Sequence, residues 1–177
     1  MKKFNLFLIC GMLSIFCSSN ASGQSLSKKF SFGFGLEAGL PTGDVKEAYN
    51  FTGGLTLRFA YHVGPGFATL TTGGIAFIPE SLEGEDVKAG LLIPVKAGYK
   101  YIIKDHFFVM GEVGYGSFKQ YYSDDNGELA SVSNGGFAYA PTIGVQFNAL
   151  ELGLRYESVS LPGGTLSFLG FRLGFNF

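Results

Sequence analysis

The residues best able to do chemistry in this chain are charged side chains placed at alternate positions of several segments. They comprise five basic and four acidic residues: Glu37, Arg58, Lys96, Lys100, Glu112, Glu151, Arg155, Glu157 and Arg172. Buried ions must pair, because desolvation otherwise costs several kcal/mol per ion. A set so nearly balanced in sign predicts a structural ion network on an enclosed face. Its principal members would be Glu37, Arg58, Lys96, Glu112, Arg155, Glu157 and Arg172.

Some of these charges can be paired by counting along the chain. A turn centred on Lys104 places Lys96 opposite Glu112 on neighbouring strands. Glu37 can reach Arg58 or Arg172, which lie on the two segments expected beside it. The alternative is that the charged face lines a selective pore or a proton path.

Groups suited to catalysis or metal binding are scarce elsewhere. The two histidines, His62 and His106, each lie beside a short turn. We expect no catalytic residue, no cofactor and no resident metal ion. One oxygen-rich turn resembles part of a calcium loop but lacks its full spacing. Its candidate contacts are Asp124, Asp125, Asn126 and Glu128, and a solvated acidic loop is the simpler interpretation.

The N-terminal residues have the order of a secretory signal peptide. Two lysines precede an apolar stretch, and small polar residues follow it up to Gly23. We expect cleavage after Gly23, or two residues earlier, which gives a signal peptide over 1–23 and one domain over 24–177. Both cysteines lie in the first part, so no disulfide is expected in the mature chain. Lipidation at Cys17 is the alternative, although a large side chain precedes it where a small one is expected.

The composition excludes several classes of protein. Charged residues make up 15% of the chain, whereas a soluble domain usually carries about a quarter. A hydrophobic share of 46% argues against disorder. The 13 basic residues face 14 acidic ones without a basic stripe, which argues against nucleic-acid binding.

Period-two alternation runs through the mature chain and predicts strands with one apolar face. Eight such segments are each about as long as a tilted strand that crosses a bilayer. They are 31–40, 54–63, 67–78, 91–101, 107–118, 137–147, 150–157 and 169–177. Residues 71–74 blur the facing of the third segment, where we expect a β-bulge.

The connections between these segments alternate in length. The long ones are 41–52, 79–87, 119–135 and 158–165. The short ones are 64–66, a turn at Lys104, and 148–149. This order is typical of outer-membrane barrels, which have long external loops and short periplasmic turns. The chain is therefore predicted to be all-β, an eight-stranded antiparallel up-and-down transmembrane β-barrel. A soluble barrel of lipocalin type, with its apolar face inward, is the alternative.

The aromatic residues favour an apolar face turned to lipid. They gather near both strand ends, as expected of belts at two membrane interfaces. The periplasmic set is Tyr61, Tyr99, Tyr101, Phe107, Phe147, Phe175 and Phe177, and the outer set is Phe77, Tyr115, Phe137, Tyr139 and Tyr156. The last strand also resembles the recognition signal of the outer-membrane barrel assembly machinery, through Phe171, Leu173, Phe175 and Phe177.

Two adjacent segments carry a family resemblance. Residues 91–101 form an apolar strand with Ile93-Pro94, and the Gly-rich aromatic strand 107–115 follows after a tight turn. This pattern resembles the small PorT-like outer-membrane β-barrel family and, more loosely, other eight-stranded outer-membrane proteins. The resemblance implies the outer membrane of a Gram-negative bacterium and an accessory role in a secretion or surface-assembly system.

We expect a monomeric, non-enzymatic structural or interaction protein that presents acidic loops to the outside, with loop 119–135 foremost. Its expected partners are outer-membrane lipid, lipopolysaccharide, the barrel assembly machinery during biogenesis, and an envelope protein. Nucleic acid is not an expected partner. A narrow porin is the alternative. A lipid-A-modifying enzyme is less favoured, because such barrels place a histidine on the outer-leaflet side, whereas both histidines here fall at periplasmic strand ends.

Overall fold

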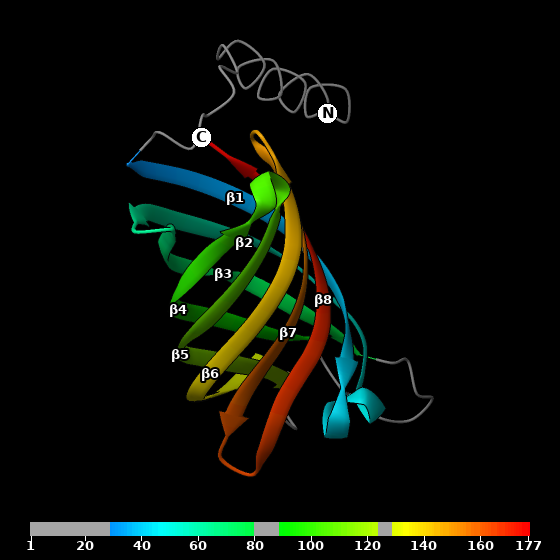
Figure 1. Cartoon of the computed structure of the whole chain (residues 1–177). Coiled ribbons are helices and arrows are strands. Elements are labelled where there is room, and N and C mark those ends of the chain that lie inside the picture. Colours follow the sequence, from blue (N-terminus) through cyan, green and yellow to red (C-terminus); the bar gives the residue numbers. More distant parts are fainter. Residues whose placement is uncertain (1–28, 80–88, 124–128) are drawn as a thin grey trace, which may run out of the picture.

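Eight antiparallel strands pair in chain order, and the last pairs with the first, so that the sheet closes (Figure 1). The computed structural model describes residues 29–79, 89–123 and 129–177. The signal peptide expected over 1–23 and the calcium contacts expected at 124–128 lie outside the described residues. None of the described helices is long and apolar enough to span a membrane.

The elements follow one another in a simple meander. They are β1 (Phe30–Thr42), η1 (Gly43–Glu47), β2 (Tyr49–Val63), β3 (Gly66–Pro79), β4 (Gly90–Ile103), η2 (Lys104–His106), β5 (Phe107–Ser123), β6 (Leu129–Phe147), β7 (Leu150–Leu161) and β8 (Gly164–Asn176). Phe32 and Phe177 exchange backbone hydrogen bonds of 3.0 and 2.7 Å across the β1–β8 closure.

The barrel has two unlike ends. The terminal end, at the upper left of Figure 1, carries the start of β1, the end of β8 and the β2–β3, β4–β5 and β6–β7 turns. Gly64 and Asn148 have φ of 60° and 49° in two of these turns, a conformation that glycine and asparagine tolerate. The opposite end, the loop end, carries η1 and the β7–β8 turn.

Side chains alternate in and out along each strand. Leu36, Leu55 and Val113 are exposed on the outer wall, while Glu37, Thr56 and Glu112 on the same strands are buried. Polar-in and apolar-out is the inverse of a lipocalin-type barrel. The predicted eight-stranded antiparallel barrel is therefore confirmed.

Two predicted long loops are wrong, because strands occupy them. β5 and β6 have 17 and 19 residues and pair as far as Ser123 opposite Leu129, inside the expected loop 119–135. Leu161 lies opposite Gly164, so a tight turn replaces the expected loop 158–165. The alternation of apolar and polar residues disappears in these strand ends. In β5–β6 polar residues occupy both faces, and in β7 the consecutive residues Glu157, Ser158 and Val159 are all buried.

The predicted β-bulge at residues 71–74 is also wrong. β3 keeps one register against β2 from Phe51–Ile78 to Val63–Gly66, and the shift lies in β2, between Tyr49 and Phe51. Thr69, Thr71, Ile75 and Phe77 all point inward. The facing looked blurred because the inward face changes from polar to apolar partway along β3.

Candidate functional site in the barrel lumen

The lumen contains one cluster of nine charged side chains. They come from β1, β2, β4, β5, β7 and β8, and each is at most 5% exposed. They are the same nine residues that alternate along the polar strand faces: Glu37, Arg58, Lys96, Lys100, Glu112, Glu151, Arg155, Glu157 and Arg172. We call this cluster the lumen network.

Glu151 is the acceptor nearest the terminal end. Its Oε1 lies 2.5 Å from Nη1 of Arg58 and 2.7 Å from Nη1 of Arg172. Its Oε2 accepts a hydrogen bond from Nζ of Lys100. Three cations from three strands therefore converge on one carboxylate of β7.

Arg155 is the cation on which the other three carboxylates converge, as the three cations converge on Glu151. Its Nη1 lies 3.2 Å from Oε1 of Glu37 and 3.3 Å from Oε2 of Glu157, and its Nη2 lies 3.6 Å from Oε2 of Glu112. Lys96 forms an ion pair with Glu157. Glu112 also lies 3.9 Å from Arg58, which joins the two halves of the network.

Two threonine hydroxyls add hydrogen bonds to the network. Thr71 Oγ1 donates to Glu112 at 2.5 Å and accepts a hydrogen bond of 3.1 Å from Nε of Arg58. Thr56 Oγ1 donates to Glu37 at 2.8 Å and accepts one of 3.3 Å from Nε of Arg172. Such hydroxyls satisfy lone pairs and protons that ion pairs alone leave without partners.

The observed pairs differ from the counted ones. Lys96 lies opposite Gly114, while Glu112 lies opposite Gly98, so the predicted Lys96–Glu112 pairing is wrong. The three-residue η2 moves the centre of the β4–β5 turn from Lys104 to the next residue, which shifts the register.

Glu37 was expected to reach one of two arginines. It lies opposite Arg172, with 3.4 Å between Oε1 and Nε. Arg58 is directed instead to Glu112 and Glu151. Of the two candidate arginines, Arg172 is thus the one that contacts Glu37.

Lys100 lies on the terminal side of the network, which as a whole has five cations and four carboxylates. Besides Glu151, its ammonium donates to Oε1 of Gln146 at 2.5 Å. It also lies 4.2 Å from the ring centroid of Phe108, a cation–π contact. A neutral amide and an aromatic face thus compensate the cation in excess.

The network fills its section of the lumen. Lys96, Arg155, Glu157 and Arg172 have no solvent-accessible surface. A water-filled passage beside these side chains would give them accessible area. This section of the barrel is therefore packed, as expected for eight strands, whose interior holds side chains rather than a channel.

An apolar cluster closes the lumen toward the loop end. We call it the plug, and its buried members are Tyr49, Ile75, Phe77, Leu92, Phe118, Ala138, Val159, Leu166 and Phe168. The Phe77 ring meets the rings of Tyr49, Phe118 and Phe168 at centroid distances of 5.6–5.7 Å, all edge-to-face. Val45 of η1 packs against the plug from the loop side.

The plug corrects one predicted membrane-facing residue. Phe77 was expected in the outer aromatic belt, but its side chain is fully buried in the lumen. The sequence carried a signal for this, because Phe77 shares the period of Thr69 and Thr71, which face inward. The abundance of aromatic residues near strand ends obscured that signal.

The remaining belt residues lie on the outer wall. Near the loop end, Tyr115, Phe137, Tyr139 and Tyr156 are exposed. Near the terminal end, so are Tyr61, Tyr99, Tyr101, Phe107, Phe147 and Phe177. On β8, Phe171 and Phe177 are exposed, whereas Leu173 and Phe175 are half-buried by neighbouring strands.

The other candidate groups are not brought together. His62 and His106 are exposed at the terminal end, on β2 and η2. His106 Nδ1 lies 3.3 Å from the Gln146 carbonyl oxygen. Among the described residues, no group of three or more His, Cys, Asp or Glu side chains could hold a metal ion.

Comparisons with known proteins agree on the architecture. A family model described as outer membrane protein beta-barrel domain matches residues 8–177. No curated protein matches the chain.

Solved structures share the fold at low sequence identity. Ail of Yersinia pestis is 17% identical with a TM-score of 0.57, and the match covers 84% of this chain and 96% of Ail. The N-terminal β-barrel domain of Pseudomonas aeruginosa OprF is 12% identical with a TM-score of 0.61, covering 83% and 97%. Neisserial surface protein A is 11% identical with a TM-score of 0.55, covering 85% and 98%.

Proposed function

Because the chain belongs to the outer membrane protein beta-barrel domain family, we propose that it is a sealed, non-enzymatic barrel that acts through its loop end. The family places it in the outer membrane of a Gram-negative bacterium. Within this proposal the terminal end faces the periplasm and the loop end faces the outside, as is usual for barrels with short periplasmic turns.

The closed lumen carries this proposal. The lumen network and the plug follow one another along the barrel axis, and the network side chains have almost no accessible surface. A barrel filled in this way has no route for a solute, which disfavours the narrow porin. Its exposed histidines lie at the terminal end, away from the outer leaflet where a lipid-A-modifying enzyme would act.

The β5–β6 hairpin supports the choice of the loop end as the interaction surface. In the described part of the chain, the pairing of β6 with β7 begins at Ala138. Residues 131–134 therefore pair with β5 on one side only, and all four are exposed. An unpaired strand edge offers backbone donors and acceptors to a partner.

Several finer assignments belong to the same proposal. They are cleavage of the 1–23 signal peptide, recognition of β8 by the barrel assembly machinery, a monomeric state and an accessory role in a PorT-like secretion or surface-assembly system. The acidic loops would contact lipopolysaccharide or an envelope protein, with Asp124, Asp125, Asn126 and Glu128 as calcium or partner contacts.

Single-cysteine labelling of intact cells tests the exposed end. Ser131→Cys at the loop end should react with a membrane-impermeant maleimide in whole cells. Pro65→Cys, in the β2–β3 turn, should react only after the outer membrane is permeabilised. The wild type is the background control, because its two cysteines both precede residue 18. Labelling of Pro65→Cys but not Ser131→Cys in intact cells would refute the proposed interaction end.

A further inference from the structure

Two of the eight strand pairings in the closed sheet are interrupted partway along their length. The β3–β4 ladder skips residues 73–74 and 93–94, and the β6–β7 ladder skips residues 140–141 and 156–157. The register is the same on both sides of each gap, so the strands stay adjacent while their pairing is broken. Within the described strands, the one other irregularity is the register shift near the loop end of β2.

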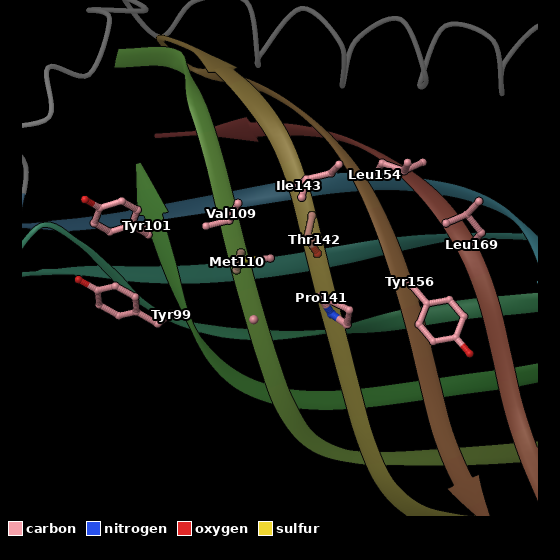
Figure 2. Close-up of a pocket in the computed structure, with 11 residues that line it drawn as sticks. Tyr99, Tyr101, Val109, Met110, Pro141, Thr142, Ile143, Leu154, Tyr156 and Leu169 are labelled. Carbon is pink, nitrogen blue, oxygen red and sulfur yellow. The ribbon is translucent and has the colours of Figure 1, made fainter. Parts of the chain in front are cut away.

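Each gap contains a proline that lies well inside its strand. A proline has no N–H, so Pro94 cannot donate to Gly73, and Pro141 cannot donate to Tyr156, the residues that the register places opposite them. Figure 2 shows Pro141 and Tyr156 on neighbouring strands, beside a hollow of the outer wall that both residues line. Proline is normally confined to edge strands or bulges, and a carbonyl without a donor is costly in a membrane. The sequence thus interrupts the wall at two places despite this cost.

The two gaps divide the wall into two sheets. β4, β5 and β6 pair with one another without interruption, and β7, β8, β1, β2 and β3 do so apart from the shift in β2. Both prolines keep their pairing with β5, where Pro94 lies opposite Gly116 and Pro141 lies opposite Gly111. The gaps therefore lie on the two outer sides of the β4–β6 sheet. We call this sheet the panel and the two gaps its seams.

Side chains in the lumen connect the panel with the rest of the barrel. The panel carries three charges of the lumen network, Lys96, Lys100 and Glu112, and each forms ion pairs only with residues of the other sheet in the described structure. Their partners are Glu157 for Lys96, Glu151 for Lys100, and Arg58 and Arg155 for Glu112. In the plug, the rings of Phe77 on β3 and Phe118 on β5 meet in the same way. Side-chain contacts thus join the two sheets where the backbone ladders are incomplete.

We propose that the panel moves as one piece against the rest of the barrel by local opening of its two seams, and that the ion pairs of the lumen network keep the seams closed. Ladders inside the panel stay intact during this motion, because opening begins where backbone hydrogen bonds are fewest. The panel also carries the β5–β6 hairpin, so it connects the proposed interaction surface with the lumen. This inference goes beyond the proposed function and does not depend on it, because the seams belong to the wall itself.

Amide hydrogen exchange of the full barrel in lipid nanodiscs, followed by NMR, tests the seams. The reporting amides are those of Gly73 and Tyr156, opposite the two prolines. The reference amides are those of Val95 and Val113, which lie in the uninterrupted β4–β5 ladder. After correction for intrinsic rates, the reporting amides should exchange at least about fivefold faster than the reference amides, the factor expected for the loss of one hydrogen bond.

Three variants separate the roles of the proline and of the charges. Pro141→Ala restores the missing donor and should slow exchange of the Tyr156 amide at least about fivefold, without affecting Gly73 at the other seam. Pro65→Ala, in the β2–β3 turn, is the matched control and should change neither amide. Glu112→Gln removes a charge that pairs across the lumen, so it should speed exchange at both seams and leave the reference amides unchanged.

Equal exchange at the seams and inside the panel of the wild type would overturn the proposal. So would a Tyr156 amide that exchanges as fast in Pro141→Ala as in the wild type. Glu112→Gln that speeds exchange equally at the reporting and reference amides would show that the charge stabilises the whole barrel rather than the seams. Pro141→Ala keeps every charge, so it decides the question even if Glu112→Gln does not fold.

Discussion

At the residue scale, the lumen network links strands that do not touch each other. Lys96 of β4 pairs with Glu157 of β7 across the barrel, and Arg58 of β2 reaches Glu151 of β7. Apolar residues could fill the same volume at similar stability. Charged groups accept few alternative partners, however, so we infer that the network helps to select one strand register.

The Lys96–Glu157 pair gives a quantitative test of this coupling. Lys96→Met or Glu157→Met alone should lower the free energy of unfolding by about 3–5 kcal/mol, because each leaves a buried charge with one partner fewer. The double variant should cost less than the sum of the two. Urea-dependent folding into lipid vesicles measures all four states of the cycle.

The exposed Lys119→Met is the control for this cycle, and it should change stability by less than about 0.5 kcal/mol. Strict additivity of the Lys96 and Glu157 substitutions would show that the two charges do not stabilise one another.

The inward facing of all nine charges could be predicted from the sequence, whereas their partners could not. Facing depends only on the two-residue period of a strand. Pairing depends on the register, which the length of η2 fixes, and on contacts across the lumen. Neither has a local sequence signature, which is why counting along the chain pairs Lys96 with Glu112 and does not identify its partner on β7.

At the element scale, the residues on the inward and outward faces of the strands change in polarity from the middle of the wall to the loop end. Near the middle of the wall, outward residues are apolar and inward ones are charged. Toward the loop end, the inward face becomes apolar at Ile75 and Phe77, and both faces of β6 are exposed at residues 131–134. The strand centres could therefore be predicted from alternation, but the strand ends could not, because the period-two contrast disappears there.

The plug should contribute strongly to barrel stability. Phe77→Ala should lower the free energy of unfolding by about 3–5 kcal/mol, because it removes the ring that three other aromatic rings surround. The temperature at which heat-modifiable gel mobility is lost should fall accordingly. Phe137→Ala, on the lipid-facing wall of β6, should have a smaller effect. Equal losses of stability at the two positions would show that packing in the plug contributes no more than packing on the outer wall.

At the scale of the whole molecule, the low charge and high glycine content have separate structural origins. The outer wall is apolar because it faces lipid, and the charges concentrate in the lumen. Glycines of the inward face, such as Gly35 and Gly98, leave room for Arg172 and Glu112. Side chains therefore fill the lumen, and under the proposed function this filling distinguishes the barrel from a porin of similar strand architecture.

Conductance of the purified protein in planar bilayers tests this closed lumen most directly. Folding should first be verified by heat-modifiable gel mobility, so that an inactive preparation is not mistaken for a sealed one. The folded wild-type protein is predicted to show no steady single-channel conductance, because the lumen network and the plug occupy successive sections of the barrel. Reproducible, steady channels from the folded protein would contradict the account and favour the narrow porin.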